Sequence, residues 1–270
     1  MPNFLKNKKL GFTLIELLVV IAIAGLILSI TMIALKNSRE KARLTSIAQF
    51  VATTQHSLGA YGSGAWAFKE GVGTSVKDST GNGNDGTVSG ASWVADNPSG
   101  AGWSLNFNGA NNWVDCGNKS GLNLSGKATI VAWVKMTALP GASAYGVLFK
   151  GDNYKFGITQ NAPAGRVLAY NGSTTIYSTK LIPAGEWHHI AISINSGTAT
   201  FYVDGVVNNS ASFTLGATNT NNLFIGKGLA SGEYFNGLIS DVRIYSEAIT
   251  LAQIQKIYAE EAEQLGLARK

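Results

Sequence analysis

The residues that could bind a metal ion are concentrated in one glycine-rich stretch and one later position. Residues 78–86 read Asp-Ser-Thr-Gly-Asn-Gly-Asn-Asp-Gly, in which Asp78, Asn82 and Asn84 supply carboxylate and amide oxygens. Asp241 adds another carboxylate late in the chain. Calcium takes about six to eight oxygen ligands, including backbone carbonyls, so this loop is chemically suitable for it. The same residue types also form ordinary turns without a metal, and that alternative stays open.

The acidic residues do not predict a hydrolase. Glycoside hydrolysis needs two carboxylates about 5 to 10 Å apart across a cleft. The acids after residue 60 are scattered and never occupy alternate positions of one predicted strand. We therefore expect no enzymatic activity, and a membrane-tethered enzyme acting on glycans is the least favoured interpretation. These acids are Glu70, Asp78, Asp85, Asp96, Asp115, Asp152, Glu186, Asp204, Glu233, Asp241 and Glu247.

Histidine and tryptophan side chains offer little further chemistry. His188 and His189 are adjacent, so in a strand they point to opposite faces and cannot form a pair of metal ligands. We expect one of them at the edge of the core and the other outside. Three tryptophans within apolar runs are expected in the core, and three flanked by Asn, Gly and Ser are better candidates for exposure. The first group is Trp66, Trp133 and Trp187, and the second is Trp93, Trp103 and Trp113.

A different chemistry is expected near the amino terminus, where Glu16 begins a long apolar run. From Leu17 to Leu35 no residue is charged, and as a helix this run reaches roughly 28 Å, close to the ~30 Å hydrocarbon core of a bilayer. An unpaired carboxylate is costly in that environment. Cleavage between Gly11 and Phe12 would create an α-amino group one helical turn from Glu16, as a partner for it in the same chain or in a neighbouring copy.

Residues 8–16, Lys-Lys-Leu-Gly-Phe-Thr-Leu-Ile-Glu, resemble the prepilin processing motif of type IV pilins and pseudopilins. The resemblance extends over residues 6 to about 60. It implies that a prepilin peptidase cleaves after Gly11 and methylates Phe12, and that Glu16 takes part in filament assembly. It also implies that the amino terminus is inside and the body outside the cytoplasm. Two alternatives are a secretory signal peptide in residues 1–24 and a plain single-span anchor, and Glu16 fits both less well.

Composition favours a body rich in strands and turns. The 270-residue chain has 10% aromatic residues, 14% charged residues and 32 glycines, which is typical of a folded, turn-rich protein. The formal charge of +5 includes three lysines of the leader, and without them it is 5 − 3 = +2. We therefore predict no nucleic-acid partner. The single cysteine, Cys116, excludes an intrachain disulfide and is expected to be a buried hydrophobic residue.

The elements that follow the membrane span are predicted to be the rest of one helix and then many strands. The apolar spacing and the lack of proline extend the helix from Phe12 to about Ser57. From Ala65 onward, short alternating runs separated by Gly, Asn, Asp and Ser predict strands. Asp204-Gly205 predicts a tight hairpin turn. The expected strands are 65–68, 104–108, 129–136, 147–150, 154–158, 166–170, 174–178, 188–195, 198–204, 223–227 and 237–245.

The chain is predicted to end in a short helix. Thr250 and Gln253 form a capping box at its start, and Gly266 is expected to end it. We expect one apolar face, made of Leu251, Ile254, Ile257, Tyr258 and Leu265.

Four blocks of the body resemble the LamG-like, concanavalin A-like jelly-roll domain: residues 65–88, 104–118, 185–206 and 236–258. The resemblance implies a two-sheet sandwich, and it implies that the 78–85 loop and Asp241 lie together around calcium. The fold hosts lectins, glycosidases and adhesive modules, so the resemblance leaves the ligand unassigned.

These observations together predict an α+β chain with four parts. They are a leader (1–11), a pilin helix (12–61) with a membrane span of about 12–35, a jelly-roll domain (62–247), and a C-terminal helix and tail (248–270). The expected function is that of a type IV pilin-like subunit, a minor pilin, in the cytoplasmic membrane with its body outside. It would assemble with other pilin subunits into a filament and bind a surface glycan or protein. The alternative is a pseudopilin of a secretion or DNA-uptake system.

Overall fold

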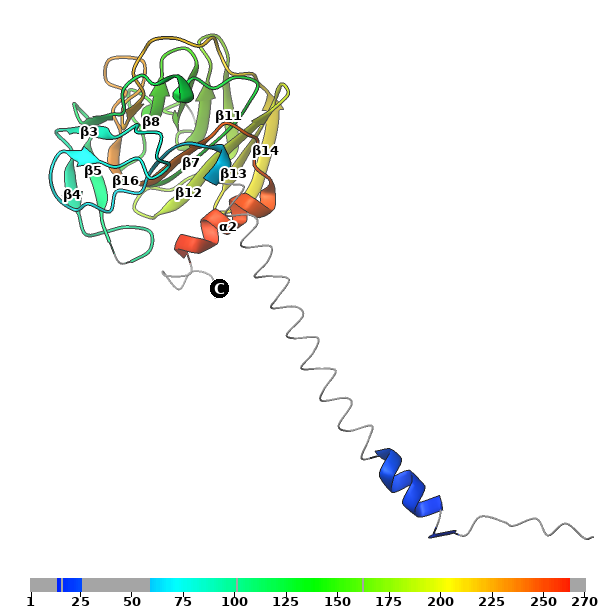
Figure 1. The fold of residues 1–270 in the computed structure, drawn as a ribbon. Helices are drawn as coiled ribbons and strands as arrows, with labels where there is room; N and C mark the ends of the chain where they lie inside the picture. Colours follow the sequence, from blue (N-terminus) through cyan, green and yellow to red (C-terminus); the bar gives the residue numbers. More distant parts are fainter. Residues whose placement is uncertain (1–13, 16, 26–58, 101, 162, 263–270) are drawn as a thin grey trace, which may run out of the picture. The chain divides into compact units, whose positions relative to one another are not determined.

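The computed structural model describes residues 14–15, 17–25, 59–100, 102–161 and 163–262 (Figure 1). The chain divides into two compact units, Met1–His56 and Ser57–Lys270. In the first unit, residues 14–15 and 17–25 are helical, and their side chains are exposed. Within the described ranges, no helix is both long enough and apolar enough to cross a membrane. Gly11, Phe12, Glu16 and residues 26–57 of the predicted helix lie outside the described residues.

The second unit is a two-sheet sandwich, as the sequence predicts, and each sheet has eight strands (Figure 1). The first sheet has the order β14-β13-β12-β7-β16-β5-β4, and β1 pairs with β16 beside β5. The second has the order β11-β10-β9-β8-β15-β6-β3-β2. The strands of the first sheet are β1 (Gly62–Trp66), β4 (Ser92–Val94), β5 (Ser104–Asn108), β7 (Lys127–Met136), β12 (His188–Asn195), β13 (Thr198–Val203), β14 (Val206–Ser212) and β16 (Asn236–Tyr245). Those of the second are β2 (Ser75–Val76), β3 (Gly86–Ser89), β6 (Trp113–Asp115), β8 (Tyr145–Lys150), β9 (Tyr154–Ile158), β10 (Arg166–Tyr170), β11 (Thr175–Leu181) and β15 (Phe224–Ile225).

The main core lies between the two sheets and follows from side-chain alternation along the strands. In β12, Ile190, Ile192 and Ile194 are buried in the main core, while Ala191 belongs to a separate cluster on the other face. Successive strand residues point to opposite faces, so each strand divides its apolar residues in this way. The tight turn predicted between β13 and β14 is confirmed, since Asp204 (φ 53°) and Gly205 (φ 72°) both take positive φ values.

The helix α2 (Leu251–Ala262) covers part of the outer face of the first sheet (Figure 1). Ile254 and Ile257 are fully buried, in one cluster with residues of β7, β12, β13 and β16. The predicted capping box is present, because Gln253 N donates to Thr250 Oγ1 (3.3 Å) and Thr250 N donates to Gln253 Oε1 (2.8 Å). Leu251 was expected on the apolar face, but its side chain is 39% exposed. Ile249, two residues earlier, is buried in the cluster that covers the sheet, so Leu251 points away from that cluster.

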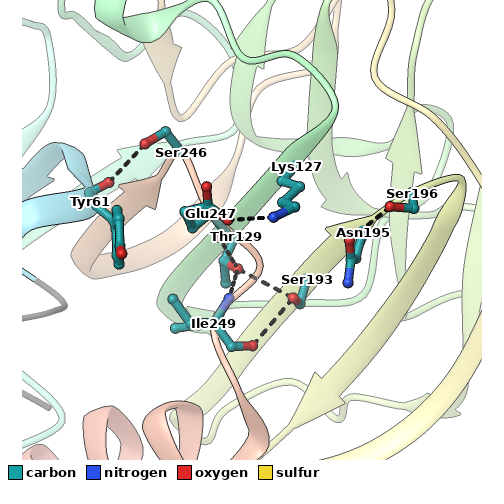
Figure 2. A network of polar contacts seen from close by, with 9 residues as sticks. All are labelled: Tyr61, Lys127, Thr129, Ser193, Asn195, Ser196, Ser246, Glu247 and Ile249. Atoms are coloured by element: carbon teal, nitrogen blue, oxygen red, sulfur yellow. Dashed lines mark hydrogen bonds and ion pairs between the residues drawn. The ribbon is translucent and has the colours of Figure 1, made fainter.

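A polar network fixes the segment that joins β16 to α2 (Figure 2). Thr129 Oγ1 donates to the carbonyl oxygen of Glu247 (2.9 Å) and accepts from Ile249 N (3.0 Å). Ser246 N donates to the carbonyl oxygen of Tyr61 (3.0 Å), immediately before β1 begins. The start of β1 and the end of β16 are therefore held at the same corner of the first sheet.

Candidate functional site

A surface pocket of about 210 Å³ lies on the outer face of the second sheet, over β9, β10 and β11. A turn between β15 and β16 closes one side. The lining residues are Ala144, Lys155, Thr159, Gln160, Asn161, Leu168, Tyr170, Thr175, Tyr177, Leu229 and Glu233.

Strand alternation explains why these side chains reach the surface. Phe156 and Val167 point into the main core, so the neighbouring positions Lys155 and Leu168 point outward. The register sets Tyr170 opposite Lys155 and Tyr177 opposite Leu168. Cross-strand neighbours on one face lie close enough to interact. Four side chains from three strands therefore converge on one patch.

An ion pair lies in this pocket. Lys155 Nζ contacts Glu233 Oε1 at 2.8 Å, and the two side chains are only 9% and 12% exposed. Glu233 Oε2 accepts a hydrogen bond from Ala230 N (3.0 Å). The charge of Glu233 is therefore neutralised by Lys155, and both of its oxygens have partners.

Two tyrosines and two amide side chains provide the ligand-facing chemistry. Tyr170 and Tyr177 are half-buried, so each ring is held in place while part of it stays accessible. Tyr170 Oη donates to the carbonyl oxygen of Gly172 (2.7 Å), and Asn161 Nδ2 donates to Tyr177 Oη (3.2 Å). Such a surface can pack against the apolar face of a ring-shaped ligand while the amides exchange hydrogen bonds with its polar rim.

A second aromatic cluster lies on the same face of this sheet, at β15 and β6. Trp113 and Tyr234 have ring centroids 6.3 Å apart. Lys227 Nζ lies 5.1 Å from the centre of the Trp113 ring and 4.4 Å from that of Phe224. Both distances are within the range of a cation–π interaction.

The loop predicted to bind calcium is built around Asp78. Asp78 Oδ1 accepts from Ala65 N, Thr80 N and Thr80 Oγ1, and Oδ2 accepts from the backbone and side-chain nitrogens of Asn84. Burial raises the pKa of Asp78, but these hydrogen bonds outweigh it and the pKa is lowered. Asn82 donates to the carbonyl oxygens of Gly62 and Ser63. The loop is therefore attached to the start of β1.

The fit of this loop to calcium is partial. Asn84 Oδ1 is buried and has no hydrogen-bond partner among the described residues, so it is available as a ligand. Asp241, in contrast, is paired with Arg243, whose Nε donates to Asp241 Oδ1 at 2.8 Å. The described part of the chain contains no cluster of three or more His, Cys, Asp or Glu residues suited to a metal. Calcium stays a prediction.

The two adjacent histidines point to opposite faces as predicted, but both are buried. His188 Nδ1 lies 3.1 Å from Asp204 Oδ2. His189 is fully buried beside Trp133 and Tyr258. The expectation that one histidine would be outside is wrong because α2, which carries Tyr258, covers that face of the sheet.

The tryptophans and the cysteine follow their expected burial in most cases. Trp66, Trp133 and Cys116 are buried, and burial raises the pKa of the Cys116 thiol. Trp187, expected in the core, is only half-buried and donates from Nε1 to Asp96. Of the three expected at the surface, Trp103 is 37% exposed, and Trp93 and Trp113 are half-buried.

Sequence reasoning considered tryptophans as ligand platforms and missed the tyrosines of the pocket. A usable signal existed. Lys155, Tyr170 and Tyr177 each lie one position from an inward-facing residue of a correctly predicted strand, so their outward direction could be deduced. Their convergence could not, because Glu233 joins them from 78 residues away.

Two family models match the chain. One, described as the concanavalin A-like lectin/glucanases superfamily, matches residues 108–255. The other, described as the prokaryotic N-terminal methylation motif, matches residues 6–32. Both resemblances seen in the sequence are thereby confirmed. No curated protein matches the chain significantly.

Solved structures of similar fold include domains of larger proteins. Domain 4 of AbnA, a GH43 extracellular arabinanase from Geobacillus stearothermophilus in complex with arabinotriose, has a TM-score of 0.60 at 20% identity, over 73% of this chain and 98% of that one. The binding domain of Paraclostridial Mosquitocidal Protein 1 has a TM-score of 0.60 at 16% identity, over 75% of this chain and 53% of that one. A Trypanosoma rangeli sialidase has a TM-score of 0.55 at 17% identity, over 73% of this chain and 32% of that one.

These likenesses support the jelly-roll fold, and the lectin-type family model covers more than half of the chain. The chain therefore belongs to the concanavalin A-like lectin/glucanase superfamily, and a prokaryotic N-terminal methylation motif precedes its jelly-roll domain.

Proposed function

We propose that this chain is a type IV pilin-like subunit that displays a glycan-binding domain outside the cytoplasmic membrane. A prepilin peptidase cleaves after Gly11 and methylates Phe12, and the largely apolar segment 12–35, which contains Glu16, then anchors the chain until it assembles with other pilins. The matched methylation motif supports this part of the proposal.

The pocket on the second sheet is the observation that carries the binding role. It combines two half-buried tyrosine rings with the amides of Gln160 and Asn161. This mixture of a ring platform and amide groups suits sugars, which present both apolar ring faces and hydroxyl rims. Within the described residues, the helix α2 packs on the other sheet and not on this face.

We infer binding without turnover. The carboxylate that lines the pocket, Glu233, is held by Lys155 and by Ala230 N. Glycoside hydrolysis by the common mechanisms needs a second carboxylate across the sugar. The lining residues of this pocket provide none.

The test is a glycan array probed with the full chain in detergent micelles, followed by titration of the best ligand. Tyr177→Ala should weaken that ligand about two- to tenfold, since an aromatic contact contributes roughly 0.5 to 1.5 kcal/mol beyond its area. The matched control is Trp103→Ala, which removes an exposed ring near Gly71, outside the pocket. The proposal is contradicted if the array retains no glycan, or if Tyr177→Ala binds the best ligand as tightly as the wild type does.

We also infer that the loop of Asp78, Asn82 and Asn84 binds calcium, with Asp241 as the fourth expected ligand. The orphaned Asn84 Oδ1 supports a cation at the loop. With a dissociation constant of about 0.1 mM, 10 mM calcium would stabilise the domain by about 2.7 kcal/mol. The melting temperature of the wild type should therefore be higher in calcium than in chelator. The control variant Asp152→Ala should show the same difference, whereas Asp78→Asn should melt at the same temperature in both solutions. Equal wild-type curves would remove calcium from the loop.

A further inference from the structure

Two cations on the open face of the second sheet have no partner that satisfies their charge. Arg166 stacks on Tyr177, with its guanidinium carbon 4.8 Å from the ring centre. Lys227 is held over Trp113 and Phe224. Within the described part of the chain, neither side chain forms an ion pair or donates a hydrogen bond, and Arg166 Nε is buried without a partner.

The acidic groups of the same face are already engaged. Glu233 is paired with Lys155. Asp115 accepts hydrogen bonds from Gly117 N and Asn222 Nδ2. A ligand that lies on this face therefore meets two cations with free N–H donors, the neutralised Lys155–Glu233 pair, and the hydrogen-bonded but still negative carboxylate of Asp115.

The two cations lie at opposite ends of one cross-strand row. The backbone of Lys227 approaches Gly146 so closely that a Cβ on Gly146 would lie 2.2 Å from it. Across the sheet, Gly146 of β8 pairs with Gly157 of β9, and Gly157 pairs with Leu168 of β10. Leu168 in turn pairs with Tyr177 of β11, on whose ring Arg166 stacks. Three strand intervals of about 4.8 Å, from Gly146 to Tyr177, give a row of roughly 14 Å. The pocket residues Leu168 and Tyr177 lie on this row.

We propose that this face binds an acidic polysaccharide whose chain crosses the strands from Tyr177 toward Trp113, with sugar carboxylates bound by Arg166 and Lys227. This deepens the proposed glycan-binding function and rests on it. Arg166 offers a planar set of donors that matches a carboxylate, and its stack on Tyr177 holds that set in place. Lys227 provides a second, compact charge at the far end. The length of the row fits several sugar units of one chain.

The experiment compares polygalacturonate, alginate and hyaluronan oligosaccharides with their carboxyl-reduced, neutral forms. The full chain in detergent micelles is titrated with each by calorimetry. At least one acidic form should bind about tenfold tighter than its neutral form at low salt, and the preference should shrink as salt screens the charges. Arg166→Gln and Lys227→Gln should each weaken the acidic form about three- to tenfold and leave the neutral form unchanged.

The controls separate a built site from general charge. Lys127→Gln removes the same charge from the first sheet, where Lys127 pairs with Glu247, and should change nothing. Lys227→Arg should retain the preference. Equal losses in Lys127→Gln and Lys227→Gln, or equal binding of double-stranded DNA, would overturn the inference.

The outcomes also distinguish this inference from the proposed function. Binding of neutral glycans that depends on Tyr177, with no preference for any acidic form, would overturn the acidic ligand and leave the glycan-binding function standing. Binding of no glycan, neutral or acidic, would overturn both.

Discussion

The ring of His189 is buried without a hydrogen bond to either nitrogen within the described structure. Burial lowers its pKa from 6.5 to about 4, more than the nearby carboxylates of Asp241 and Asp204 raise it. The folded protein therefore holds a neutral imidazole beside the stacked rings of Trp133 and Tyr258. In the unfolded chain the same ring takes up a proton near pH 6.5.

This difference predicts a loss of stability in mild acid. The folded pKa is depressed for a base, so the unfolded state binds more protons below pH 6.5 and stability falls as the pH falls toward 4. Between pH 7 and pH 5 the loss from His189 is about 2 kcal/mol. Urea unfolding of residues 57–270, the second compact unit, at several pH values checks it. His189→Leu should flatten this step, and an unchanged slope in that variant would assign the step to another group.

At the scale of elements, α2 is attached to the first sheet by a narrow apolar stripe. Ile254 and Ile257 are fully buried, whereas Leu251 is 39% exposed. Truncation of a buried isoleucine removes its apolar contacts and leaves a cavity. Truncation of Leu251, which is partly exposed in the first turn, removes far fewer buried apolar contacts.

Ile254→Ala should therefore lower the free energy of unfolding by about 3 kcal/mol, and Leu251→Ala by less than about 1 kcal/mol. Chemical denaturation of both variants in the same conditions gives the comparison. Equal losses would mean that α2 lies on the sheet in another rotation.

Part of the fold could be predicted from sequence because several strands are long enough to show a period of two. The limits of β5, β9, β10 and β12 agree with the predicted ones. The short strands β2, β3 and β4 were missed, since two to four residues among Gly, Asn and Ser give no measurable alternation.

The candidate site was less predictable than the fold. The pocket depends on register between strands and on the turn that carries Glu233, and neither is encoded in local spacing. Likewise, the burial of His189 depends on α2, which follows β12 by more than fifty residues. A single sequence shows which side chains leave a strand on the same side, but not which distant element covers them.

At the scale of the whole molecule, the chain joins a segment with the methylation motif to a separately folded domain. If the proposal holds, the mature chain begins at Phe12, because cleavage follows Gly11. Intact mass of the membrane-extracted protein should show the loss of residues 1–11 and the gain of one methyl group. A mature start at Gly25 would identify a secretory signal peptide instead.

Glu16→Ala extends the same test to assembly. Removal of a carboxylate from an apolar run makes membrane insertion easier, so the variant should remain in the membrane but enter filaments poorly. Membrane fractions and imaging of surface filaments give the two readings. Absence of the variant from the membrane would contradict an assembly role for Glu16.

The pairing of β1 with β16 determines how the domain carries mechanical load. The chain enters the domain at Gly62, and β1 pairs antiparallel with the end of β16, from Gly62 opposite Tyr245 to Trp66 opposite Val242. Force applied through the preceding residues therefore passes from β1 to β16, and β16 also pairs with β7. The proposed ligand face is on the other sheet, and among the described strands no backbone ladder joins the two sheets. Tension between anchor and ligand must cross the packed core, the connecting loops and the side-chain hydrogen bonds that join β11 to β14, such as that from Asn209 Nδ2 to the carbonyl oxygen of Tyr177 (3.1 Å), so we expect these contacts to share the load.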